Sequence, residues 1–347
     1  MSSVSKISPL IVFCLSSALL SSSTDVESQL ESLMALLVDL ISNLSPRRWP
    51  SDDLEEQCST QIDLLLAELQ SRIVGNIAAQ KFLFKASRFG LPSIDNLKFS
   101  NNYIVSYDNR LKQPVWSLEH LTDSLMKVFN VARKRHAFFV DSTIHEYFRS
   151  AEVDYRFTGF DRGHLVPACD NVANARWVDQ SYLLSNVVPM APNINRGPWA
   201  RLEGYVTHVA RHSKNIYIVT GTLYLSTTSL PYWPRTSRMS YRVLGYNRVS
   251  VPTHLYKVLV SETHQGQLMM EAFLMPNTNE VNRYTHLRDF KIDVERNLPE
   301  IEEAAGLTIF DTLDRGRVTK PGTLQYGYDE YIEESLRRVA TIKQLDG

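Results

Sequence analysis

The sequence has few cysteines and almost no excess of charge of either sign. Its 347 residues include three cysteines, Cys14, Cys58 and Cys169, which are too few for a disulfide framework, and no Cys/His cluster offers a zinc site. The 37 Lys and Arg against 38 Asp and Glu give a formal net charge of −1. The chain therefore lacks the basic excess of a protein that coats nucleic acid, and any phosphate binding must be local.

A long apolar run is also missing. Residues 1–23 hold one cation, Lys6, an apolar stretch from Ile11 to Leu20 and then three serines. This layout is typical of a targeting segment and is too short for a membrane-spanning helix, so we predict no stable membrane span. A secretory signal, an organellar presequence and a weak membrane anchor all remain compatible with it.

Two helices are predicted after this segment. Apolar residues recur at helical spacing from Val26 to Leu44 and again from Leu54 to Ile73. We therefore predict a helical hairpin over residues 24–75. It is either a packing appendage of the main domain or a surface for a partner or for self-association.

Beyond residue 88 the pattern changes to short β-rich runs around one amphipathic helix. From 198 to 212, Trp199, Leu202, Val206 and Val209 fall on one helical face. The β-rich runs are residues 103–107, 114–119, 215–220, 241–244, 249–251, 254–260 and 268–275. The main domain is thus predicted to be α+β. Residues 312–347 are predicted to be a polar tail with a terminal helix from about 329 to 345.

The chemistry is concentrated in residues 159–168, Gly-Phe-Asp-Arg-Gly-His-Leu-Val-Pro-Ala. His164 offers a titratable imidazole, and the guanidinium of Arg162 beside it can hold a phosphate oxygen. This block has little specificity alone, because the chain repeats Asp-Arg-Gly at 314–316 with Arg317 in place of the histidine.

Two further blocks follow at short distance: Ser-Asn-Val-Val-Pro at 185–189, and Asn195 with Trp199 and Glu203 spaced four residues apart. The Asp-Arg-Gly-His, Ser-Asn-x-x-Pro and Asn-x-x-x-Trp-x-x-x-Glu blocks, in this order, resemble the DNA/RNA non-specific endonuclease family. The flanking residues 88–92 and 251–254 resemble its endonuclease G branch. The likeness covers roughly residues 88–310 and leaves out the N-terminal helices and the C-terminal tail.

The resemblance implies a ββα-metal nuclease fold over residues 88–311, with a central, mostly antiparallel sheet flanked by helices. It implies an endonuclease that cuts DNA and RNA to 5′-phosphate and 3′-hydroxyl ends with Mg²⁺, or alternatively Mn²⁺, as cofactor. It also implies a homodimer and a mitochondrial location, with secretion as the alternative.

Carried over residue by residue, the resemblance implies that His164 is the general base and Asn195 the direct metal ligand. Arg162, Asn186 and Glu203 would support them. Elementary chemistry agrees, because Mg²⁺ keeps several waters and needs only one amide oxygen besides a substrate phosphate. Glu203 lies five residues beyond Pro198, which corresponds to roughly 7.5 Å of rise along a helix. This distance makes direct coordination alongside Asn195 awkward and favours contact with metal-bound waters.

A looser alignment assigns Arg133 to a substrate phosphate, although it belongs to a charge run that is ordinarily solvated. The other assignments also have plain structural alternatives. Asn195 could cap a helix, Asn186 could satisfy backbone groups at a strand end, and Glu203 could be a solvated helix residue. Trp199 is predicted to belong to the core.

One position departs from the family pattern. Thr207 stands where an arginine is common one turn after Glu203, so charge stabilisation in the transition state is expected to be weaker. Two other functions compete with an active nuclease. One is a catalytically weakened nuclease-fold module that binds nucleic acid, and the other is a scaffold built on the helical hairpin. Neither explains why His164, Asn195 and Glu203 occur together, so we predict an active nuclease.

Overall fold

The computed structural model describes residues 82–128, 137–225 and 239–319. The targeting segment, the helical hairpin, Arg133 and the terminal helix all lie outside these residues.

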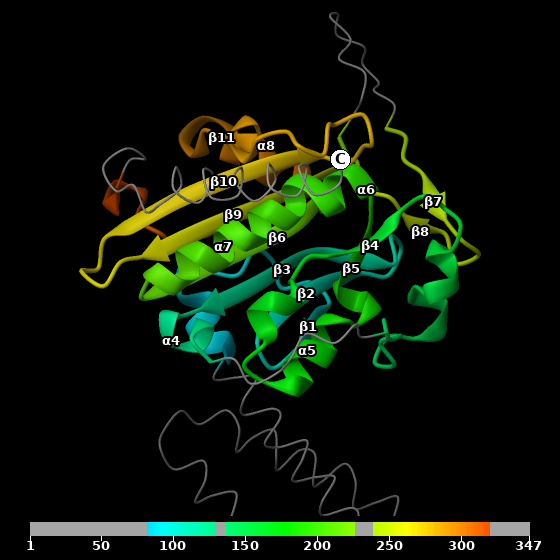
Figure 1. Ribbon diagram of the computed structural model, residues 1–347, viewed down its shortest axis with the longest axis horizontal. Helices are drawn as coiled ribbons and strands as arrows, with labels where there is room; N and C mark the ends of the chain where they lie inside the picture. The colour runs from blue at the N-terminus through cyan, green and yellow to red at the C-terminus, as the bar shows by residue number, and fades with distance from the viewer. Residues whose placement is uncertain (1–81, 129–136, 226–238, 320–347) are drawn as a thin grey trace, which may run out of the picture. The chain divides into compact units, whose positions relative to one another are not determined.

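An eight-stranded sheet forms the centre of the described structure (Figure 1). Its strand order is β1-β2-β3-β6-β9-β10-β11, and β12 also pairs with β10. The strands are β1 (Leu97–Phe99), β2 (Tyr103–Asp108), β3 (Gln113–Leu121), β6 (Asn215–Leu223), β9 (His254–Glu262), β10 (Leu268–Pro276), β11 (Lys291–Ile292) and β12 (Val318–Thr319). The β10–β12 pair is parallel and the other pairs are antiparallel. The predicted α+β class and mostly antiparallel sheet are confirmed.

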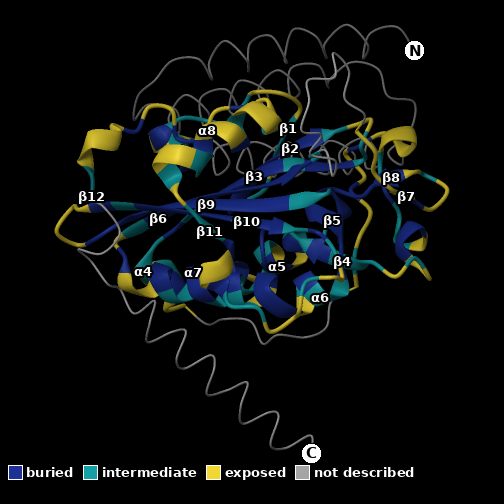
Figure 2. Cartoon of the chain, turned by 90° about the horizontal axis from the view of Figure 1, so that it is seen from above, coloured by how far each residue is buried: buried dark blue, intermediate teal, exposed yellow. Residues whose placement is uncertain are grey.

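Both faces of the sheet are covered, which is why its central strands read as nearly continuous apolar runs. Successive side chains of a strand point to opposite faces. In β6, Ile216 and Ile218 belong to one hydrophobic core, whereas Tyr217 and Val219 belong to the other. The first core lies under α7 and the second under α8, on opposite sides of the sheet (Figure 2).

The α-helices differ in how clearly the sequence predicts them. The α-helices are α4 (Asp123–Met126), α5 (Ala175–Ser181), α6 (Pro192–Ile194), α7 (Ala200–His212) and α8 (Val294–Ala305). The predicted amphipathic helix is α7, whose Leu202, Val206 and Val209 are buried as expected. The sequence did not predict α8, which buries only Leu298 and Ile301 and has Pro299, a residue that ordinarily breaks helices, inside it.

Two small strand pairs and several short turns complete the described fold. The pair β4 (Asp161–His164) and β5 (Val187–Met190) lies beside the N-terminal end of α7, and β7 (Val243–Leu244) and β8 (Val249–Ser250) form a separate hairpin. The 3-10 turns are η2 (Ser87–Phe89), η3 (Glu146–Phe148), η4 (Glu152–Tyr155), η5 (Ala168–Asn171), η6 (Leu184–Asn186), η8 (Leu287–Phe290) and η9 (Arg315–Arg317). None of the described helices combines the length and apolarity needed to cross a membrane.

Candidate active site

Strand β4 carries the Asp-Arg-Gly-His block. It pairs with β5, so that Gly163 lies opposite Val188 and His164 opposite Val187. A Cβ atom at Gly163 would lie 2.5–2.9 Å from atoms of the Met190 side chain, closer than real contacts allow. Glycine is therefore required here by the close approach of β5, and His164 ends the strand as the last paired residue.

The imidazole of His164 lies between two aromatic rings. Its ring centroid is 5.2 Å from that of Phe138 and 5.0 Å from that of Tyr182. Its Nε2 is buried and has no hydrogen-bond partner among the described residues. Because this apolar surround disfavours the charged ring, burial lowers the pKa of His164 to about 4. The imidazole is thus neutral at neutral pH, as a general base must be.

Side chains of Trp199 and Lys257 hold the backbone around His164 in place. The indole Nε1 of Trp199 donates a hydrogen bond of 3.2 Å to the carbonyl oxygen of His164. The ammonium of Lys257 lies 5.3 Å from the Trp199 ring and donates to the carbonyl oxygen of Leu165. Trp199 belongs to the core as predicted, and it also fixes the strand end that presents the imidazole.

Asn195 begins η7 (Asn195–Trp199), a five-residue segment that joins α6 to α7 across a kink. The kink lies at Gly197, where a Cβ atom would lie 2.7 Å from the carbonyl oxygen of Arg283. The kink separates Asn195 from the regular hydrogen bonding of α7 and aims its side chain toward β4.

Asp161 fixes the orientation of that side chain. Its Oδ2 accepts a hydrogen bond of 3.0 Å from Nδ2 of Asn195, while Arg196 donates to both of its carboxylate oxygens, at 2.8 and 2.6 Å. Since the amide nitrogen of Asn195 is engaged, its oxygen is the group left to face a cation. This contact assigns Asp161 a role that the sequence did not predict.

These residues line a pocket of about 330 Å³. The guanidinium of Arg162 lies 4.8 Å from the Phe138 ring and 3.2 Å from a carboxylate oxygen of Glu152, which also lies 3.5 Å from Arg156. The full lining is Phe138, Glu152, Tyr155, Arg156, Phe160, Asp161, Arg162, Asn195 and Arg196. Three arginines against two carboxylates make this pocket suited to an anion, and His164 lies behind it, against Phe138.

Asn186 does not reach the pocket. It is fully buried, and its side chain accepts a hydrogen bond from the backbone N–H of Val166 and donates to the carbonyl oxygens of Val166 and Ser181. We assigned Asn186 to the catalytic group, and this geometry instead favours its structural alternative. Asn186 fixes the chain that leaves His164 and has no group to offer a substrate.

Glu203 lies in the first turn of α7, near a buried acidic cluster behind the helix. Burial raises the pKa of Glu119 well above its ordinary value, and the carboxylates of Asp170 and Glu203 raise it further while Lys257 opposes them. Among the described residues, no three His, Cys, Asp or Glu side chains come together as a metal site.

Thr207, the departure from the family pattern, faces this cluster. Its hydroxyl lies 3.0 Å from Oδ1 of Asp170 and 3.0 Å from the carbonyl oxygen of Glu203. An arginine at this position would meet Asp170 first. The sequence could not reveal this neighbour, because Asp170 lies 37 positions away in η5.

Comparison with known proteins identifies the family. The sequence profile of the DNA/RNA non-specific endonucleases matches residues 83–316. The chain belongs to the DNA/RNA non-specific endonuclease family. It is therefore a nuclease, and it binds nucleic acid. The match begins just before η2 and ends within η9, so the sheet from β1 to β11 belongs to the family domain.

Several family members are similar over most of this region. Mitochondrial endonuclease G of Homo sapiens is 35% identical over 221 residues, which are 64% of this chain and 71% of that protein. Nuclease C1 of Cunninghamella echinulata is 38% identical over 215 residues, 61% of this chain and 82% of that protein. The crystal structure of an EndoG/EndoGI complex superimposes with a TM-score of 0.60 at 33% identity, covering 69% of this chain and 95% of that chain.

Proposed function

We propose that this nuclease hydrolyses phosphodiester bonds of DNA and RNA with Mg²⁺ held by Asn195 and with His164 as the general base. The observation that carries the proposal is the hydrogen bond from Asn195 to Asp161, which leaves one amide oxygen for a cation in an arginine-lined pocket. Mg²⁺ suits a single amide oxygen because it retains waters, and Mn²⁺ is an alternative with similar ligands.

We assign each of these residues one role in the hydrolysis. Neutral His164 accepts a proton from water, and the resulting hydroxide attacks phosphorus in line with the leaving O3′. Arg162 would hold a non-bridging oxygen, and Glu203 would accept hydrogen bonds from waters bound to a cation held by Asn195. A bound divalent cation stabilises negative charge on the phosphoryl oxygens. The P–O3′ bond breaks as the new P–O bond forms, and O3′ takes a proton from a water molecule, so that the products carry 5′-phosphate and 3′-hydroxyl ends.

Weak sequence preference is expected, because these groups act on phosphate and sugar rather than on base edges. Purified full-length protein should therefore cut both plasmid DNA and RNA in Mg²⁺, and chelation should stop both reactions. A protein that bound both substrates but cut neither would instead support the nuclease-fold binding module. The neutral, apolar setting of His164 favours catalysis over that alternative, since a binding site requires cations rather than a general base.

Assembly and location remain proposals drawn from relatives. Endonuclease G proteins of Homo sapiens, Bos taurus and Caenorhabditis elegans carry mitochondrial names, so we propose a mitochondrial location for this chain as well. We also propose a homodimer. Light scattering of the full chain and of a variant lacking residues 1–75 would show whether the catalytic domain or the predicted hairpin carries self-association.

Replacing Asp161 with alanine should lower activity by about 10- to 100-fold, as is typical when the partner of a metal ligand is lost. The cause is positional, because Asn195 would no longer be held by its amide nitrogen. The Mg²⁺ concentration for half-maximal activity should rise in parallel. Asp161→Asn retains an oxygen that can accept the same hydrogen bond, so it should recover part of the loss. Unchanged metal dependence in Asp161→Ala would refute this positioning role.

The low pKa of His164 predicts the acid limb of the pH profile. The base acts only when neutral, and protonation is disfavoured in the fold, so kcat/KM should fall as pH drops through about 4. An unperturbed histidine would lose activity around pH 6.5. The test is to measure kcat/KM from pH 4.5 to 8, with circular dichroism confirming the fold at each pH. A low pKa predicts little loss of kcat/KM above pH 5, whereas an ordinary histidine predicts a fall around pH 6.5. A limb centred near 6.5 would contradict the buried, neutral imidazole.

A further inference from the structure

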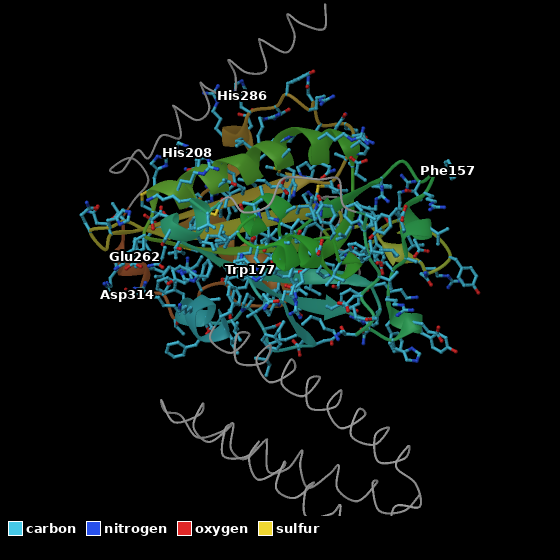
Figure 3. The ribbon with its side chains drawn as sticks, turned by 60° about the horizontal axis from the view of Figure 1, so that its bottom comes forward. Phe157, Trp177, His208, Glu262, His286 and Asp314 are labelled. Atoms are coloured by element: carbon cyan, nitrogen blue, oxygen red, sulfur yellow. The ribbon has the colours of Figure 1, made fainter. Side chains whose placement is uncertain are left out.

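A strained turn exposes an aromatic ring beside the pocket. Phe157 is fully exposed and has φ 59°, in the left-handed region that L-residues rarely occupy. The turn is held by its own hydrogen bonds: the Thr158 hydroxyl donates to the carbonyl oxygen of Tyr155, and the Phe160 backbone N–H donates to that hydroxyl. Figure 3 labels Phe157 at the periphery of the described structure. Packing explains neither the strain nor the exposed ring.

Residues on both sides of this turn belong to the pocket wall. Tyr155 and Arg156 line the pocket before it, and Phe160 and Arg162 line it afterwards. Phe157 therefore projects from the edge of the same wall that presents the arginines.

A second exposed ring comes from the β7–β8 hairpin. The backbone N–H and the side-chain amide of Asn247 donate to the two carboxylate oxygens of Asp154, at 3.0 and 2.8 Å. Gly245 approaches Asp154 so closely that a Cβ atom would lie 2.3–2.6 Å from its atoms. Tyr246 lies between these two anchors and is 96% exposed. We call Phe157 and Tyr246 the aromatic rim.

An arginine-lined pocket fits single-stranded nucleic acid when exposed aromatic rings lie near it. Phe157 lies between its lining residues, and Tyr246 lies on a hairpin bound to Asp154, the neighbour of pocket-lining Tyr155. Arginines track the phosphates, while aromatic rings stack on the faces of bases, whatever their sequence. In an intact duplex those faces are already stacked on neighbouring base pairs. We propose that the aromatic rim stacks on unpaired bases next to the phosphate in the pocket, so that this nuclease binds single strands more tightly than duplex. The proposal rests on the proposed function in placing the scissile phosphate beside Asn195.

The test is the double variant Phe157→Ala/Tyr246→Ala, measured by fluorescence anisotropy in the presence of a chelator. The probes are a labelled single-stranded deoxythymidine oligonucleotide and a labelled hairpin duplex with the same number of phosphates. Loss of stacking should weaken binding of the single strand by about tenfold or more. Binding of the duplex should change by less than about twofold, and the salt dependence of both should persist because the arginines remain. Phe84→Ala is the matched control, since Phe84 is 84% exposed and is not among the pocket-lining residues.

A variant at Phe157 alone separates substrate binding from folding. Phe157→Gly relieves the left-handed backbone, so the melting temperature should stay the same or rise while single-strand binding weakens. A lower melting temperature would indicate a structural ring. Equal losses on both probes, or no loss on either, would overturn the stacking proposal; the latter would make the rim a surface for a protein partner. These binding measurements need no turnover, so failure of Mg²⁺-dependent cleavage would refute the proposed function without deciding the role of the rim.

Discussion

His164→Ala should slow cleavage of plasmid DNA and of RNA by about 10²- to 10⁴-fold, the usual contribution of a general base. The imidazole contacts the rings of Phe138 and Tyr182 but makes no hydrogen bond through its buried Nε2 within the described residues. Its removal therefore takes away the proton acceptor and leaves the Asp161–Asn195 contact in place. Substrate affinity should change little, so the loss should lie in kcat rather than in KM.

The matched control is His264→Ala. His264 lies in the turn between β9 and β10, and its side chain is 55% exposed, with Nε2 at 3.8 Å from a carboxylate oxygen of Asp123. Its removal should therefore leave the cleavage rate unchanged. Near wild-type turnover in His164→Ala would exclude it as the base. A large loss in both variants would indicate a general effect on the fold.

Asn195→Ala should abolish most activity, and added Mg²⁺ should restore little of it. The amide oxygen of Asn195 is the one protein ligand that we propose for the cation, and truncation also leaves Asp161 with an unfilled acceptor. Isothermal titration calorimetry with Mg²⁺ should show weakened binding in the variant. Unaltered Mg²⁺ affinity would mean that another residue holds the metal.

Asn193→Ala provides the control for this variant. Asn193 lies two residues earlier in α6, and its side-chain amide donates 2.8 Å to the carbonyl oxygen of Asn279 rather than to Asp161. It resembles Asn195 in type and neighbourhood but not in orientation. Mg²⁺ binding and turnover should both be retained, which would assign the loss in Asn195→Ala to the ligand.

Local patterns in the sequence predicted much of this structure. The β-rich runs 103–107 and 114–119 form the β2–β3 hairpin, and the apolar face of residues 198–212 is buried in α7. The family resemblance also singled out His164 and Asn195, and the structure places the first at the end of β4 and the second at the start of η7, before α7. Each of these features depends on residues close together in the chain, where periodicity and turn residues are informative.

Contacts between distant segments escaped prediction. Asp161 and Asn195 are 34 positions apart, and the ring of Phe138 reaches His164 from a segment that the sequence left without a role. Asn186 was assigned to the catalytic group because its motif is shared with the family, yet its hydrogen bonds are all to backbone. A motif identifies a residue that is needed, but only its partners in space reveal whether it contacts the substrate or supports the chain.

The central claim, that water activated by His164 attacks phosphorus in this pocket, is tested most directly by cleavage in H₂¹⁸O. The substrate is a short DNA oligonucleotide, incubated with the full chain and Mg²⁺ under single-turnover conditions. Mass spectrometry of both fragments should find one ¹⁸O atom in the new 5′-phosphate and none in the new 3′-hydroxyl, and His164→Ala should yield neither product at a comparable rate. Label in a 3′-phosphate, or unlabelled 5′-phosphate ends, would contradict the mechanism.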